Sequence, residues 1–140
     1  MPERAMLLAA VMLVVVAGVV LTRRYAAARA KGVIAGPAAP LWASLSAQPD
    51  GRPTLVTFST PSCAACHVAQ APAVQRVEQQ LGGDGVRLIR VDAAAQPEVA
   101  RSFGVMTVPA TVVLARTGNV LAVNQGFAPT VKLVEQLQGA

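Results

Sequence analysis

The chain has 140 residues, a hydrophobic fraction of 54% and a formal net charge of +5 at pH 7. Beyond a distinct N-terminal segment, the length allows one modest domain with a single core. The basic residues from position 32 onward lie singly among a similar number of acids, which excludes the clustered basic face that nucleic-acid binding needs.

An uncharged apolar run covers residues 5–22, between Arg4 and the pair Arg23-Arg24. As a helix it would be about 27 Å long, which matches the hydrocarbon core of a bilayer. A cleaved signal peptide is the alternative, but its apolar core is shorter and leads directly into small residues, whereas two arginines intervene here. We therefore predict a single uncleaved transmembrane anchor that, with its basic flank, covers residues 1–31.

The charges that flank this run bear on the orientation of the chain. One basic residue precedes it, and four follow it within the anchor segment: Arg23, Arg24, Arg29 and Lys31. The positive-inside rule keeps the more basic flank in the cytoplasm. The rule favours a cytoplasmic domain, with an extracytoplasmic one as the alternative.

Small residues with two prolines fill positions 32–40 (GVIAGPAAP). This composition buries little surface and resists helix formation, so it predicts a linker. We expect the folded domain to cover residues 41–140. It begins with a short amphipathic helix carrying Leu41, Trp42 and Leu45, which ends before the turn signal Pro49-Asp50-Gly51.

Strand and helix patterns alternate through the rest of the domain. Strands are predicted at 54–59, 86–92, 110–115 and 119–124; helices are predicted from Cys63 to about Leu81, from Pro97 to Gly104 and over 130–137. In the last helix Val131, Val134 and Leu137 are the spaced apolar residues. The order β-α-β-α-β-β-α predicts an α/β domain, a mixed sheet flanked by helices that ends in a hairpin.

Cys63 and Cys66 are the only cysteines, and they lie three residues apart where a helix begins. The free N–H groups and dipole of a helix start favour a thiolate at Cys63, the expected nucleophile, with Cys66 as the resolving thiol. A purely structural disulfide is the alternative, but it would close a very small loop that constrains the unfolded chain little. A CxxC beside a βαβ pattern therefore indicates redox chemistry.

With His67 the motif Cys-Ala-Ala-Cys-His also has the spacing of c-type haem attachment. In that case His67 would bind the iron, with Met106 as the candidate second ligand. The four predicted strands argue against a haem protein, because small cytochrome domains are helical. Two cysteines and one histidine fall short of a four-ligand structural zinc site. We expect no metal and no cofactor other than the disulfide. His67 lies about one helical turn after Cys63. It either stabilises the Cys63 thiolate electrostatically or is an exposed residue without a functional role.

Four features in this order resemble the thioredoxin family over residues 41–140: CxxC at a helix start, Asp92 at the end of a strand, Phe103-Gly104-Val105, and Val108-Pro109. The resemblance implies a thioredoxin-like fold and a thiol–disulfide oxidoreductase that acts on protein thiols and disulfides. Reduction of partner disulfides is favoured over oxidation of partner thiols. An upstream electron donor or acceptor would then be a second partner. The resemblance also implies that Pro109 is a cis-proline against the disulfide. The Val108 backbone would pair with an extended substrate, and Gly126 would line the same groove.

The chain also departs from the family pattern. Ser62 replaces the usual tryptophan, and Thr57 replaces the buried aspartate that assists proton transfer to the resolving thiol. Another group or water must then deprotonate Cys66. Pro72 falls one residue after the family's kink proline. A redox-inert binding module is a further alternative, and the intact cysteines and Pro109 argue against it.

Overall fold

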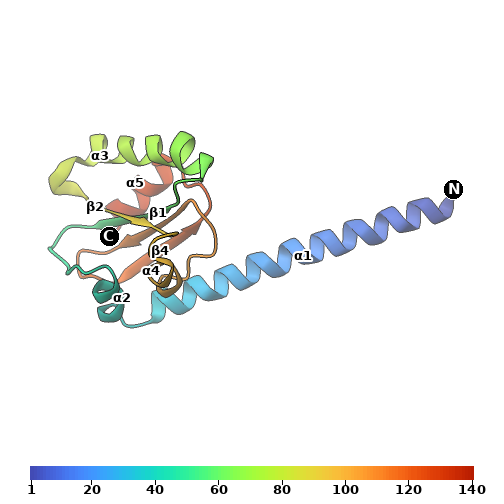
Figure 1. Ribbon diagram of the computed structural model, residues 1–140, viewed down its shortest axis with the longest axis horizontal. Coiled ribbons are helices and arrows are strands. Elements are labelled where there is room, and N and C mark those ends of the chain that lie inside the picture. Colours follow the sequence, from blue (N-terminus) through green and yellow to red (C-terminus); the bar gives the residue numbers. More distant parts are fainter.

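The computed structural model describes all residues, 1–140, and its domain is built on one four-stranded sheet (Figure 1). The strands lie in the order β2-β1-β3-β4. Strand β1 pairs in parallel with β2 and antiparallel with β3, and β3 pairs antiparallel with β4. Their bounds are β1 Thr54–Ser59, β2 Arg87–Asp92, β3 Ala110–Leu114 and β4 Val120–Gln125. The predicted mixed sheet with a final hairpin is confirmed.

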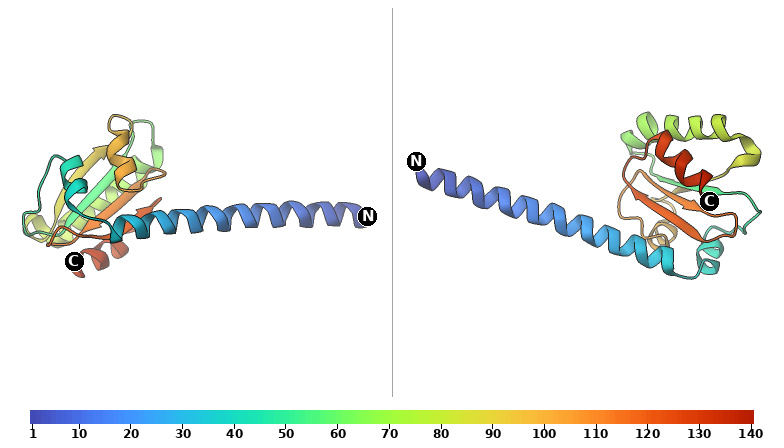
Figure 2. Two further views of the ribbon diagram at one scale, coloured as in Figure 1. Left: turned by 90° about the horizontal axis from the view of Figure 1, so that it is seen from below. Right: turned by 180° about the vertical axis from the view of Figure 1, so that it is seen from behind.

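Helices cover both faces of the sheet (Figures 1 and 2). On one face lie α3 (Ala71–Gly85) and α5 (Thr130–Gln138), and on the other α2 (Ala39–Ser44) and α4 (Pro97–Ser102). Because successive side chains of a strand point to opposite faces, Leu55 of β1 packs with α3 and α5, whereas Val56 and Phe58 pack with α2 and α4. The domain therefore has two apolar clusters separated by the sheet.

The inward face of helix α5 includes only part of the apolar residues spaced along the predicted helix. Val131 is exposed, and the buried residues are Leu133 and Leu137, four positions apart. The start of the helix fixes this rotation, because the Thr130 hydroxyl donates a hydrogen bond to the Ala73 carbonyl in α3. The prediction of a helix is confirmed; of its spaced apolar residues, Leu137 is buried, Val134 packs against the core and Val131 is exposed.

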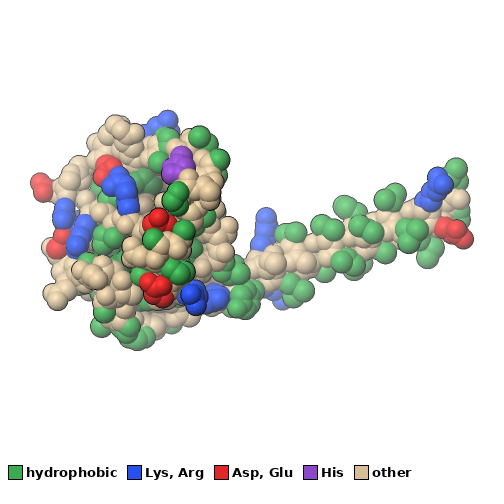
Figure 3. Space-filling view, in the orientation of Figure 1, with side chains coloured by type: hydrophobic (Ala, Val, Ile, Leu, Met, Phe, Trp, Pro, Cys, Tyr) green, Lys and Arg blue, Asp and Glu red, His purple; other side chains and the backbone are tan.

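An N-terminal helix, α1 (Pro2–Ala35), projects from the domain and is long and apolar enough to cross a membrane. Its apolar side chains are exposed along the segment outside the domain (Figure 3). Its C-terminal end contacts the domain: Val33 packs against the cluster of α2 and α4, and a Cβ atom on Gly104 would lie 3.1 Å from Val33 Cγ2.

The predicted non-helical linker over 32–40 is largely wrong. Helix α1 continues to Ala35 and α2 begins at Ala39, so only residues 36–38 are outside a helix. The helix persists because Val33 gains a tertiary contact that composition does not reveal. It ends at Gly36, which is extended, because the following Pro37 disfavours helical geometry at the residue before it.

One glycine fits closely beneath α2. The Trp42 indole donates a 2.7 Å hydrogen bond to the Gly118 carbonyl in the β3–β4 turn. Gly118 has a φ of +97°, and a Cβ atom there would lie 2.8 Å from Pro49 Cγ. Both the backbone conformation and the limited space therefore require glycine.

We expect Gly118→Ala to lower the free energy of unfolding by about 1–3 kcal/mol, because alanine is strained at positive φ and meets Pro49. Gly83→Ala is the matched control: nothing lies near its Cβ position, so its effect should stay within about 0.5 kcal/mol. Urea unfolding measures both. Equal stability of the two variants would show that the turn adapts to a side chain.

Candidate active site

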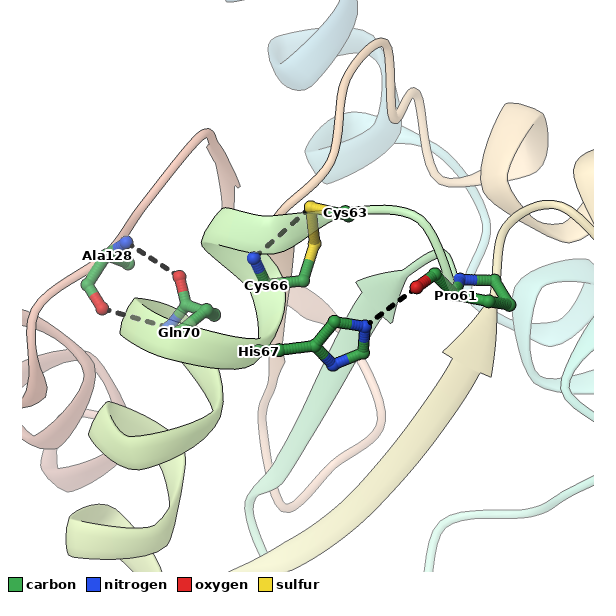
Figure 4. The surroundings of a disulfide bond; sticks show 6 residues. All are labelled: Pro61, Cys63, Cys66, His67, Gln70 and Ala128. Carbon is green, nitrogen blue, oxygen red and sulfur yellow. Dashed lines mark hydrogen bonds between the residues drawn. A yellow bond between two sulfur atoms is a disulfide. The ribbon is translucent and has the colours of Figure 1, made fainter.

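The two cysteines follow the C-terminal end of β1 directly. After a turn in which the Cys63 N–H donates to the Thr60 carbonyl, the chain enters a helix at Ala64. Cys63 and Cys66 form a disulfide, with their Cα atoms 5.3 Å apart (Figure 4). Cys66 is buried, with 4% of its surface exposed, whereas Cys63 is only partly buried. Cys63 is thus the sulfur that a partner reaches more easily.

A backbone donor also distinguishes the two sulfur atoms. The Cys66 N–H donates a hydrogen bond to Cys63 Sγ, 3.2 Å away (Figure 4). It belongs to the first turn of the helix, where N–H groups lack a partner within the helix. Such a donor favours a negative charge on Cys63, because the hydrogen bond strengthens when sulfur becomes a thiolate.

The active-site helix contains a π-helical turn at Cys66–Gln70, immediately before α3. A π turn accommodates one more residue than an α turn. This explains why Pro72 falls one residue later than the resemblance implies: the extra residue is taken up before the proline is reached. The sequence prediction of one continuous helix misses this turn.

Gln70, the last residue of the π turn, fixes the loop between β4 and α5. Its side-chain amide donates to the Ala128 carbonyl over 3.0 Å, and its side-chain oxygen accepts the Ala128 N–H over 2.9 Å (Figure 4). Gln70 is 4% exposed and Ala128 fully buried. This clamp holds the active-site helix against the loop that starts at Gly126. This contact was not predicted. Its only signal in the sequence is that Gln70 is polar, whereas Val74 and Val77, which follow it at helical spacing, are apolar.

Residues expected to bind substrate lie at the same end of the sheet. The Val108–Pro109 peptide bond is cis, the configuration that the resemblance implies. Pro109 is buried and borders, with Cys66, a cavity of about 260 Å³. Val108 is half-buried, and Gly126 has a φ of +77° directly after β4. The substrate-binding roles of Val108, Pro109 and Gly126 stay predictions.

The His67 side chain points toward the Pro61 carbonyl rather than toward the disulfide (Figure 4). Its Nε2 lies 3.1 Å from the Pro61 carbonyl, which requires the Nε2 proton because a carbonyl can only accept (Figure 4). The side chain is exposed and makes no hydrogen bond to Cys63. The contact therefore supports the turn before Cys63, and tuning of the thiolate by His67 stays a prediction.

Thr57 lies in β1 on the face that carries α3, and it borders the cavity beside Cys66. Its neighbours across the sheet are Arg90 and Thr111. No aspartate or glutamate lines this cavity. The predicted replacement of the family's acid by Thr57 is thus not compensated by a carboxylate from another segment.

We expect Gln70→Leu to destabilise the domain by about 2–4 kcal/mol, because the buried N–H and carbonyl of Ala128 both lose their partner. Gln75→Leu is the control, because Gln75 is exposed on the same helical segment; its effect should stay within about 0.5 kcal/mol. Chemical unfolding measures both changes. Similar stability of the two variants would mean that water or a shifted loop replaces the clamp.

Comparison with known proteins agrees with this geometry. The family model for thioredoxin matches residues 42–139. Thioredoxin of Bacillus subtilis (strain 168) is 32% identical over 92 residues, which cover 66% of this chain and 86% of that protein. The solved structure of Fasciola hepatica thioredoxin has a TM-score of 0.54 at 26% identity and covers 64% of this chain and 81% of its own.

A second solved structure, a thiol:disulfide interchange protein of the thioredoxin family from Chlorobium tepidum TLS, has a TM-score of 0.55 at 20% identity. It covers 71% of this chain and 83% of its own, and it supports the fold alone. The alternatives of a haem carrier and an inert binding module are not favoured, because the match spans the whole domain and the two cysteines pair with each other. The chain therefore belongs to the thioredoxin family and is a thiol–disulfide oxidoreductase.

Proposed function

We propose that the protein reduces disulfides of partner proteins, with Cys63 as the nucleophile and Cys66 as the resolving thiol. The observation that carries this proposal is the difference between the two sulfur atoms. Cys63 is the more accessible one and accepts the Cys66 N–H, whereas Cys66 is 4% exposed. A reactive thiol needs both access and a stabilised thiolate, and only Cys63 combines them.

The reduction proceeds by two exchanges. The Cys63 thiolate attacks one sulfur of the partner disulfide and forms a mixed disulfide, while the other partner sulfur leaves as a thiolate. Cys66 then attacks Cys63 Sγ, which releases the second partner thiolate and forms the Cys63–Cys66 disulfide. Two electrons pass to the partner, and an upstream dithiol protein restores the reduced pair.

The second exchange requires Cys66 to lose its proton. The cavity beside Cys66 is lined by Thr57 and His67 and by no carboxylate. A threonine hydroxyl does not act as a base near neutral pH, and the His67 ring is hydrogen-bonded to the Pro61 carbonyl rather than to either cysteine. We propose that water takes this proton. The partner backbone lies along Val108 and Pro109, opposite Gly126, which places its sulfur near Cys63.

Helix α1 is the proposed single-pass membrane anchor. Its outer segment exposes apolar side chains to the surroundings, and basic residues follow where the helix approaches the domain. The arginines that directly follow the apolar run favour an anchor over a cleaved signal peptide. The excess of basic residues on this side favours a cytoplasmic domain. There the thiol pool keeps cysteines reduced, which suits a reductase.

The order of the two thiols can be tested on the reduced protein. We expect iodoacetamide near neutral pH to alkylate Cys63 at least about tenfold faster than Cys66, because Cys63 is only partly buried whereas Cys66 is buried, and because the Cys66 N–H favours a thiolate at Cys63. Cys66→Ser should accumulate mixed disulfides with partners, whereas Cys63→Ser should accumulate few. Mass spectrometry of alkylated peptides measures the first expectation. Faster labelling of Cys66 would reverse the assignment of nucleophile and resolving thiol.

The side of the membrane can be tested in intact cells with a membrane-impermeant maleimide after mild reduction. We expect Cys63 to be protected until the membrane is permeabilised, because the basic flank of α1 favours the cytoplasm. A variant with an added cysteine directly after Met1 is the control and should show the opposite labelling. Labelling of Cys63 in intact cells would place the domain outside.

A further inference from the structure

The redox pair and two exposed apolar residues lie at one end of the sheet. Phe58, near the end of β1, pairs with Ala110 at the start of β3, which pairs with Gln125 at the end of β4. The segments beyond these residues therefore emerge together. They carry the disulfide after β1, Met106 before β3 and Phe127 after β4. We call this the redox end of the domain.

The redox end faces the direction in which α1 leaves the domain. In Figure 1 the start of the active-site helix lies on the side toward which α1 projects. The two further views in Figure 2 agree, since the same green segment lies toward the N-terminus in both. A membrane crossed by the outer part of α1 would therefore face the redox end rather than the opposite end of the sheet.

The stretch of α1 between the apolar run and the domain is short and helical. The Arg29 carbonyl oxygen already lies 3.8 Å from the Cβ position of Gly104. Residues 23–29 separate this contact from the run that ends at Thr22, which corresponds to about 10 Å of helix. A headgroup layer is about 5–8 Å thick on each side. The redox end is thus held close to the membrane surface.

The contact of α1 with the domain is linked to the loop of the redox site. Gly104, against which Val33 packs, accepts a 2.8 Å hydrogen bond from the Gln125 side chain. The same Gln125 side chain accepts the Met106 N–H over 3.1 Å. The loop at Gly104, which contacts α1, therefore continues to Val108 and Pro109. Helix α1 and this loop are thus held as one unit.

Apolar and basic groups on this side suit a membrane-proximal partner. Val68, Met106 and Phe127 are 76%, 46% and 53% exposed. Arg29 and Arg101 line a cleft of about 420 Å³ between α1 and the domain. Exposed apolar side chains close to a bilayer favour segments at the membrane interface, and arginines favour its anionic surface.

We infer that the partner is an integral membrane protein whose disulfide lies at headgroup level, on the same side of the bilayer as the domain. The inference rests on the proposed reductase function and on α1 as the anchor. Helix α1 selects this partner because it fixes the height of the redox end above the membrane and the direction in which it faces. The redox end therefore reaches disulfides near the membrane surface more often than disulfides far from that surface.

The test uses the full chain, reduced beforehand, in phosphatidylcholine vesicles that contain a lipid with a disulfide attached to its headgroup. A seven-residue helical segment inserted between Ala26 and Ala27 raises the domain by about 10 Å above the membrane. It leaves the rotation of the domain about the helix axis nearly unchanged, because seven residues make almost two full turns. We expect single-turnover reduction of the lipid disulfide to fall about tenfold, because the redox end no longer reaches the headgroup layer. Reduction of insulin in solution should be unchanged. The same segment inserted after Met1, ahead of the apolar run, is the matched control and should retain both rates.

A second lipid probe separates lost reach from a damaged domain. Its disulfide stands on a spacer about 10 Å longer, which matches the inserted helix, so the extended chain should recover its rate. An extended chain that reduces the short probe as fast as the native chain would overturn the inference and leave the reductase function standing. Failure of the native chain to reduce insulin would instead contradict the proposed function. Failure of the native chain to float with the vesicles would contradict the anchor and the inference together.

Discussion

The pairing of Phe58 with Ala110, and of Ala110 with Gln125, is the constraint on which the redox site depends. It brings three separate loops to one end of the sheet, namely the loops that carry the Cys63–Cys66 disulfide, Pro109 and Gly126. Only main-chain hydrogen bonds and the alternation of buried side chains are needed for this register. The chemistry is then added by a few residues beyond the strand ends, where side chains can change without loss of the sheet.

Gln70 shows how a local irregularity is stabilised by a distant contact. The π turn at Cys66–Gln70 carries an extra residue, and the two hydrogen bonds of Gln70 with Ala128 hold that turn against the β4–α5 loop. Both ends of the clamp are buried, so water cannot easily replace it. The clamp joins the helix behind Cys66 to the segment of the expected substrate groove. It thereby links the position of the disulfide to the position of the segment at Gly126, whose role in partner binding stays a prediction.

Most of the fold follows from periodicity and turn signals, which is why all four strands and the order of the elements were predictable. The cysteine pair was also predictable, because its spacing has few other uses. Three features required tertiary contacts that no local pattern contains: the Gln70 clamp, the burial of Leu133 while Val131 is exposed, and the helical conformation of residues 32–35. In each case a residue distant in sequence supplies the stabilising group.

The helical conformation of residues 32–35 matters for function as well as for structure. A flexible linker of nine residues would span about 15–18 Å and let the domain rotate freely relative to α1, the proposed anchor. The redox end would then face the membrane only part of the time. With Val33 packed on the domain and only residues 36–38 outside a helix, that freedom is removed. With α1 as the proposed anchor, a restricted orientation would raise the effective concentration of Cys63 at one height above the membrane, so that partner choice would depend on where a disulfide lies as well as on its sequence.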